Sequence, residues 1–233
     1  MPGIKMRRMR TQAMRVDVEG QAPVSALLCT TDDAWSGYVF AHGAGAGMEH
    51  PFMARFAQGL RERGISSLRF QFPYMEAGGK RPDVPRVAHA AVRAAVCEAG
   101  LRLAGLPLFA GGKSFGGRMT SQAEALAPLP GLRGLVFVGF PLHTAGKPAD
   151  DRGQHLFEVR LPMLFLQGTR DELAALDRLR PLLDRIGRQA TLALFNDADH
   201  AFHVRVNSGT TDARTMATMV ETTADWMCSI LGR

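Results

Sequence analysis

The sequence is poor in the residues that staple small secreted domains or hold structural metals. Three of its 233 residues are cysteines (Cys29, Cys97 and Cys228), and these are widely spaced without a C-x-x-C pair. This pattern argues against a disulfide framework and against a thiolate metal site. A chain of this length can bury roughly 70–75% of its unfolded surface, so a hydrophobic core alone can stabilise it.

Long apolar runs are also missing, and no stretch approaches the roughly 18 apolar residues of a membrane-spanning helix. The basic start of the chain is not followed by the apolar core of a signal peptide, because Arg15, Asp17 and Glu19 interrupt it. The net charge is only +6, and the basic residues are scattered. The sequence lacks the cluster of basic and aromatic residues that is typical of nucleic-acid binding. We therefore expect a cytoplasmic protein that binds neither membranes nor nucleic acid.

What the sequence does contain is an alternation of short apolar runs and longer helical patterns. The runs are nearly continuous in apolar residues, as in strands buried on both faces of a parallel sheet. They cover residues 37–41, 65–70, 106–110, 135–140, 161–167 and 190–195. Apolar residues three and four apart predict helices at 51–63, 85–99, 115–127, 172–186 and 212–231.

This alternation predicts a single α/β domain with a mostly parallel, doubly wound sheet and right-handed crossovers. Residues 14–30 are expected to add an antiparallel hairpin at the N-terminal edge, with strands at 16–19 and 25–29. The predicted organisation is a basic segment, residues 1–14, followed by one domain over residues 15–233.

One motif follows the third parallel run, where ligands of such sheets bind. Gly112, Ser114 and Gly116 fit the pattern G-x-S-x-G between a predicted strand and a predicted helix. In that setting Ser114 lies on a sharp turn, the nucleophile elbow, whose crowding requires the two glycines. The plainer interpretation is a serine that caps a helix in a glycine-rich turn.

Two nucleotide-binding interpretations of these glycine-rich loops fail on single residues. A phosphate-binding P-loop ending at Ser114 needs glycine at position 107, where the chain has Pro107, which lacks an N–H. A dinucleotide fingerprint starting at Gly43 needs a third glycine where the chain has Met48. We accordingly expect no nucleotide, no other cofactor and no metal.

A serine hydroxyl becomes a strong nucleophile only when a base, oriented by an acid, takes its proton. His200 follows the last predicted strand and Asp171 the fifth, which gives the chain order Ser, Asp, His that this architecture uses. Asp171 could equally be the N-cap of the following helix, a role compatible with the first. The remaining acids are Asp150 or Asp151 as second choice, then Asp197 and Asp199.

An acyl-transfer site also needs N–H donors for the oxyanion. In an elbow the first donor belongs to the residue after the nucleophile, here Phe115. The second is expected in the loop after the first parallel strand, where we nominate Ala44 between two glycines. His42, which opens that loop, is expected to hold the loop in place rather than act as the base.

The motifs HGAGAG (42–47), GKSFGG (112–117), GTRD (168–171) and DADH (197–200), in this order, resemble those of the α/β-hydrolase superfamily. More narrowly the chain resembles small, capless hydrolases of the dienelactone-hydrolase-like branch, including the testis-expressed protein 30 type. RFQFPY (69–74) and FPLH (140–143) add local matches, and the resemblance covers about residues 15–232. Dienelactone hydrolases, however, carry a cysteine nucleophile where this chain has Ser114, which argues against dienelactone as the substrate.

The loops bear on the substrate. Residues 143–160 are too few for a helical cap, so the site is expected to be open or covered only by loops such as 71–83. We expect a serine hydrolase acting on short, water-soluble esters or thioesters, as a monomer or a homodimer. Three basic residues lie near the strand ends: Lys113, Arg118 and Arg69. They could favour an anionic substrate, but we expect them to be solvated surface charges. The alternative function is a catalytically silent interaction module with this fold.

Overall fold

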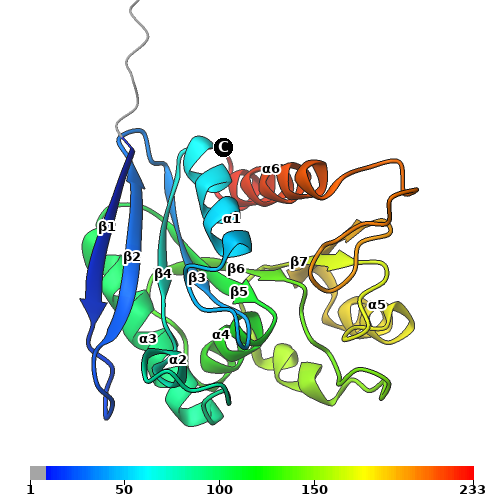
Figure 1. Ribbon diagram of the computed structural model, residues 1–233, viewed down its shortest axis with the longest axis horizontal. Helices are drawn as coiled ribbons and strands as arrows, with labels where there is room; N and C mark the ends of the chain where they lie inside the picture. The colour runs from blue at the N-terminus through cyan, green and yellow to red at the C-terminus, as the bar shows by residue number, and fades with distance from the viewer. Residues whose placement is uncertain (1–8) are drawn as a thin grey trace, which may run out of the picture.

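The computed structural model describes residues 9–233, and most of the predicted basic segment lies outside them. Its centre is an eight-stranded sheet in the order β1-β2-β4-β3-β5-β6-β7-β8 (Figure 1). The pairs from β4 to β8 are parallel, whereas β2 is antiparallel to both of its neighbours. The strands are β1 (Met9–Val16), β2 (Val24–Thr31), β3 (Ser36–Ala41), β4 (Ile65–Phe70), β5 (Leu108–Lys113), β6 (Leu132–Val138), β7 (Met163–Gly168) and β8 (Ala190–Phe195).

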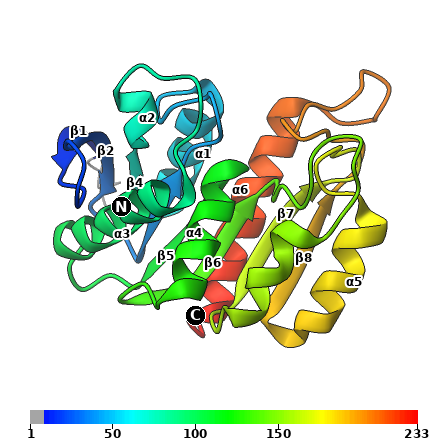
Figure 2. The same ribbon diagram turned by 90° about the horizontal axis from the view of Figure 1, so that it is seen from below.

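Helices cover both faces of the sheet (Figures 1 and 2). One face carries α1 (Pro51–Glu62) and α6 (Asp212–Ile230), and the other carries α3 (Pro85–Arg102), α4 (Phe115–Leu126) and α5 (Leu176–Ile186). Alternate residues of β6 divide between two apolar cores, as expected of a strand buried on both faces. This is the predicted α/β-hydrolase fold. Short helices also occur at α2 (Pro73–Glu76), η1 (Asp151–Glu158) and η2 (Gly187–Gln189).

The N-terminal hairpin is present, but its first strand lies earlier than predicted. Strand β1 occupies Met9–Val16 rather than residues 16–19, and it pairs with β2 from Met9↔Thr31 to Val16↔Val24. The sheet therefore begins inside the segment that the sequence assigned to a basic N-terminal extension. The side chains of residues 10–13 are exposed, so this edge strand lacks the apolar alternation that identifies a strand from sequence.

Several other boundaries differ from the prediction by a few residues, and two of these differences lie next to the predicted site. Strand β5 continues through Gly111 and Gly112 to Lys113, although glycines commonly interrupt strands. Helix α5 starts at Leu176 rather than at residue 172, because the preceding residues form a turn held by His143. The His143 Nε2 accepts the Ala175 N–H at 2.8 Å, and the His143 N–H donates to the Leu173 carbonyl at 2.9 Å.

The connection between β6 and β7 contains one 3₁₀ helix, η1, and no cap domain, in agreement with the prediction. The carboxyl ends of the parallel strands are therefore covered only by their own loops. Among residues 9–233, no helix combines the length and the apolar character that a membrane crossing requires.

Candidate active site

Ser114 lies on a strained turn between β5 and α4. Its backbone has φ 50° and ψ −115°, a region that residues other than glycine seldom occupy. The turn is possible because its neighbours lack side chains: a Cβ on Gly112 or on Gly116 would lie 2.5 Å from the Ala41 carbonyl oxygen. The structure thus contains the elbow that the G-x-S-x-G pattern predicts.

The structure brings Ser114, His200 and Asp171 into one hydrogen-bonded chain. With its proton on Nδ1, His200 donates to Asp171 Oδ2 at 2.7 Å. The Ser114 hydroxyl donates to His200 Nε2 at 2.8 Å. The carboxylate of Asp171 is fully buried, whereas the His200 side chain is about a quarter exposed (26%). A fixed buried acid thus orients an imidazole that remains accessible beside the serine.

The carboxylate of Asp171 is itself held by two other donors. The Leu173 N–H donates to Oδ1 at 2.8 Å, which makes Asp171 the anchor of the turn before α5. The buried Gln167 amide donates to Oδ2, and its oxygen accepts the Phe140 N–H at 3.0 Å. The second-choice acids, Asp150 and Asp151, lie at the start of η1, and the acceptor for His200 is Asp171.

The loop after β3 is fixed by side chains from other elements. His42 is fully buried, donates from Nδ1 to the Gly43 carbonyl and accepts the Phe72 N–H on Nε2 at 3.0 Å. Burial lowers the pKa of His42 to about 4, so this imidazole is neutral at physiological pH. Tyr74 Oη accepts the Gly45 N–H at 3.1 Å. His42 is therefore a loop-holding residue, as its position predicted.

The two nominated oxyanion donors belong to different segments of the chain. Ala44 is in the loop that His42 and Tyr74 hold, and Phe115 is the first residue of α4, where helix N–H groups have no intrahelical acceptor. Within residues 9–233 neither N–H donates to a protein acceptor. Both amides are therefore free to bind a ligand oxygen.

The expectation of solvated surface charges is wrong for two of the three basic residues. Arg69 is buried and donates to the Met48 carbonyl at 2.9 Å. Lys113 is largely buried beside the triad, donates to the His200 carbonyl, and lies 5.8 Å and 5.5 Å from the Phe52 and Phe202 ring centres. Burial lowers the Lys113 pKa to about 8, although the negative charges of Asp171 and Asp199 partly oppose this shift. Arg118 is half-buried on α4.

A model of the alpha/beta hydrolase domain family matches residues 36–228, which include every residue of this site. The chain belongs to that family. Among solved structures, the hydrolase resembles a dienelactone hydrolase from Anabaena variabilis, with a TM-score of 0.76 and 19% identity over 95% of this chain and 98% of that one.

Two further solved structures resemble this hydrolase in fold. One is an α/β serine hydrolase without a lid from Xanthomonas campestris (TM-score 0.72, 20% identity, 93% of this chain and 95% of that chain). The other is Est1E from Butyrivibrio proteoclasticus (TM-score 0.70, 14% identity, 95% of this chain and 99% of that chain). At these identities the likeness concerns the fold, and it extends over nearly the whole of each chain.

Sequence reasoning missed three residues that hold the site of this hydrolase: Gln167, His143 and Tyr74. Gln167 had a recognisable signal, because it is the one polar side chain near the end of an otherwise apolar strand, four residues before Asp171. His143 and Tyr74 act on backbone groups of distant segments, at Ala175 and Gly45, and no local pattern indicates such partners.

Proposed function

We propose that this protein is a serine hydrolase that cleaves a small, soluble ester or thioester through an acyl-enzyme intermediate. The observation that carries the proposal is the continuous contact from Asp171 through His200 to Ser114, at 2.7 Å and 2.8 Å. Its support includes the strained elbow at Ser114 and the family to which the chain belongs. Two solved structures of similar fold are described as a serine hydrolase and as a dienelactone hydrolase.

In the first half-reaction, Ser114 Oγ attacks the carbonyl carbon while its proton passes to His200 Nε2. Asp171 holds the imidazole in the required tautomer and stabilises the imidazolium that forms. The Ala44 and Phe115 N–H groups bind the oxyanion of the tetrahedral intermediate. The imidazolium then protonates the leaving alkoxide or thiolate, which departs as the Ser114 ester forms.

In the second half-reaction a water molecule replaces the leaving group. His200 takes its proton, the hydroxide attacks the acyl carbon, and the proton returns to Ser114 Oγ as the acid product leaves. The open carboxyl edge of the sheet favours this step, since only loops separate it from solvent. It also favours short substrates over long-chain lipids, which need a covered apolar tunnel.

The direct test is labelling with a fluorophosphonate, which forms a covalent bond with an activated serine. Wild type should be labelled at Ser114, and Ser114→Ala should lose labelling and, on the order of 10⁶-fold, esterase turnover. Ser121→Ala is a matched control, because Ser121 lies in α4, which follows Ser114, and also contacts a histidine, His155 of η1, at 2.8 Å. It should keep full labelling.

Folded wild type that resists the probe and hydrolyses no ester would contradict the proposal and favour the silent interaction module. A panel of esters and thioesters of graded acyl length separates the remaining substrate choices. Acetyl and butyryl esters should be preferred to long-chain triglycerides, and the reverse order would overturn the expectation of a short substrate.

A further inference from the structure

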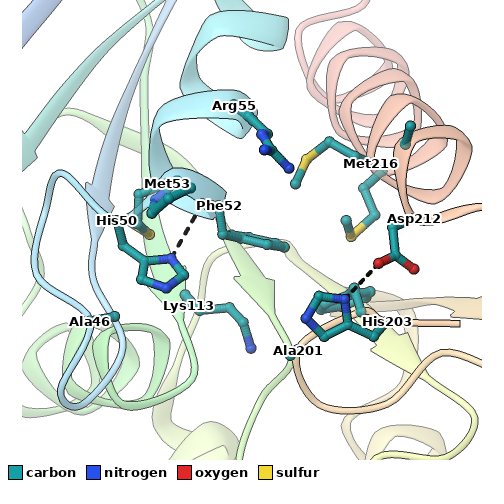
Figure 3. Close-up of a pocket in the computed structure, with 14 residues that line it drawn as sticks. Ala46, His50, Phe52, Met53, Arg55, Lys113, Ala201, His203, Asp212 and Met216 are labelled. Carbon is teal, nitrogen blue, oxygen red and sulfur yellow. Dashed lines mark hydrogen bonds and ion pairs between the residues drawn. The ribbon is translucent and has the colours of Figure 1, made fainter.

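A cavity of about 590 Å³ lies on the α1 and α6 face of the sheet, next to the chain segments that carry Ser114 and His200 (Figure 3). Its walls come from the start of α1, the start of α6, the loop after β3 and the loop that follows His200. Two of its lining residues are chain neighbours of the triad: Lys113 precedes Ser114, and Ala201 follows His200. The cavity therefore borders the segments that carry Ser114 and His200, although none of the three triad residues lines it.

The cavity combines apolar walls with positive charge. Phe52, Phe202 and Met216 are among the side chains that form the walls. Lysine and arginine are each represented once in the lining, by Lys113 and by Arg55, and Arg55 extends from α1 toward α6 in Figure 3. The apolar walls can contact the carbon chain of a ligand, and the two cations favour a negatively charged group on that chain.

Lys113 is the cation that most needs a partner. Its ammonium donates to the His200 carbonyl and lies between two aromatic rings, and within residues 9–233 it forms no ion pair. Two of its three N–H donors have no protein acceptor in the same residues. Because burying an unpaired charge is costly, an anion from outside the chain would offset that cost. A neutral chain in the cavity would instead remove the remaining water from the ammonium.

The negative groups near the cavity are already engaged. Asp212 accepts a hydrogen bond from His203 at 2.6 Å at the rim, as Figure 3 shows, and it also accepts the Val204 N–H. Asp199 accepts the Ala201 and His203 N–H groups, and Asp171 accepts from His200. Arg55 is exposed and has no ion pair in the described part of the chain, so both cations remain available.

We propose that this cavity binds a carboxylate of the substrate, so that the preferred substrates are esters or thioesters carrying an additional carboxylate on a short carbon chain. Lys113 pairs with this carboxylate inside the cavity, and Arg55 attracts it at the mouth. The inference rests on the proposed function, since it concerns what the same serine cleaves. The carboxylate can belong to the acyl part or to the alcohol part, and the experiment distinguishes the two.

The test compares matched pairs of esters that differ by one carboxylate. For the acyl part, the mono-p-nitrophenyl ester of glutaric acid is compared with p-nitrophenyl pentanoate. For the alcohol part, 4-acetoxybutanoate is compared with butyl acetate, with acid release followed by titration. In one pair or both, wild type should show kcat/KM higher by about tenfold or more for the charged member, the effect of one close, partly buried charge pair.

Three variants locate the preference. Lys113→Met should remove most of it and leave the smaller part due to Arg55, and because the ratio is measured within one variant, any displacement of His200 cancels. Arg55→Gln should reduce the ratio by about two- to threefold, as for an exposed charge pair. Arg178→Gln, an exposed arginine on α5, should leave the ratio unchanged. Arg55→Glu should lower the ratio further than Arg55→Gln, and it remains informative if Lys113→Met does not fold.

Equal kcat/KM within both pairs in wild type would overturn the proposal, as would a preference that survives both Lys113→Met and Arg55→Glu. Either result leaves the proposed function intact if the neutral esters are still hydrolysed and the fluorophosphonate still labels Ser114. Failure of the proposed function has a different signature, because then neither the neutral nor the charged esters are cleaved.

Discussion

The two sides of Ser114 are built in opposite ways. Toward β4 and α3, the rings of His42, Phe72, Tyr74 and Phe115 pack against one another with centres 4.9–6.4 Å apart. Toward α1 and α6, the space beside Lys113, the residue before Ser114, is a cavity of about 590 Å³. The first side is filled by the protein itself, and the second is left to a ligand.

The two sides also differ in their hydrogen bonding. The filled side positions the loop that carries Ala44, and two of its backbone N–H groups are held by side chains: Phe72 N–H by His42 and Gly45 N–H by Tyr74. The open side carries the Lys113 ammonium, two of whose N–H groups have no acceptor within residues 9–233. Close packing thus surrounds the loop that carries Ala44, the proposed oxyanion donor, and N–H groups without a protein acceptor lie on the side where we propose that part of the substrate binds.

The largest expected effect is on stability, from emptying the filled side. Phe72→Ala removes a fully buried ring that contacts His42, Phe70 and Phe115, and should lower the free energy of unfolding by about 3–5 kcal/mol. Phe52→Ala, on the cavity side, should cost less than half as much, because its half-buried ring already borders empty space. Urea denaturation of both variants measures the contrast, and equal losses would contradict it.

Next in size is an acid-dependent loss of stability that originates on the filled side. Burial lowers the folded-state pKa of His42 from 6.5 to about 4, so between these values the unfolded chain binds a proton that the folded chain excludes. Stability should therefore fall as pH decreases from about 6.5 to 4, by up to about 3 kcal/mol from this residue. His155, lowered to about 4 mainly by burial, adds to the slope.

The variant His42→Leu checks the source of that slope. It should be less stable at neutral pH by about 1–3 kcal/mol, because the Phe72 N–H loses its buried acceptor. Its unfolding free energy should also change less with pH between 6.5 and 4 than that of wild type. An unchanged slope, measured by urea denaturation across this range, would show that His42 does not contribute to it.

The smallest expected effect concerns the open side and the proposed carboxylate preference. Burial lowers the Lys113 pKa to about 8, while the nearby negative charges of Asp171 and Asp199 oppose this shift. Lysine is charged below its pKa, so the ratio of kcat/KM for charged over neutral esters should decline as pH rises through about 8. Of the other groups facing the cavity, Arg55 is an exposed arginine, and hydrogen bonding to Asp212 raises the pKa of His203.

Measuring the ratio from pH 6.5 to 10 in wild type and in Arg55→Gln separates the two cations. The decline should be steeper in the variant, where Lys113 alone provides the preference. Because kcat/KM reports the free enzyme, the decline should follow the pKa of Lys113 without a bound carboxylate. A ratio that stays constant across the range would exclude Lys113 as the group that titrates.

The sequence predicted the fold and the contacts among the triad residues because those features have local signals. Buried parallel strands are continuous apolar runs, and residues that follow them necessarily meet at one edge of the sheet. The exposed edge strand β1 has no such pattern, so its position was misplaced. The supporting roles of Gln167, His143 and Arg69 were not predicted, because each depends on a backbone or side-chain partner in another segment.

Gln167 fixes the orientation of the Asp171 carboxylate and also supplies one of its oxygens with a hydrogen-bond donor. Its oxygen is committed to the Phe140 N–H, so its amino group is obliged to face Asp171 Oδ2, the same oxygen that receives His200. The Phe140 N–H, just after β6, thereby determines the orientation of the Gln167 side-chain amide. That choice supplies Oδ2 with a permanent neutral donor alongside the imidazole, so no rotation of the carboxylate is needed when the imidazole becomes a cation.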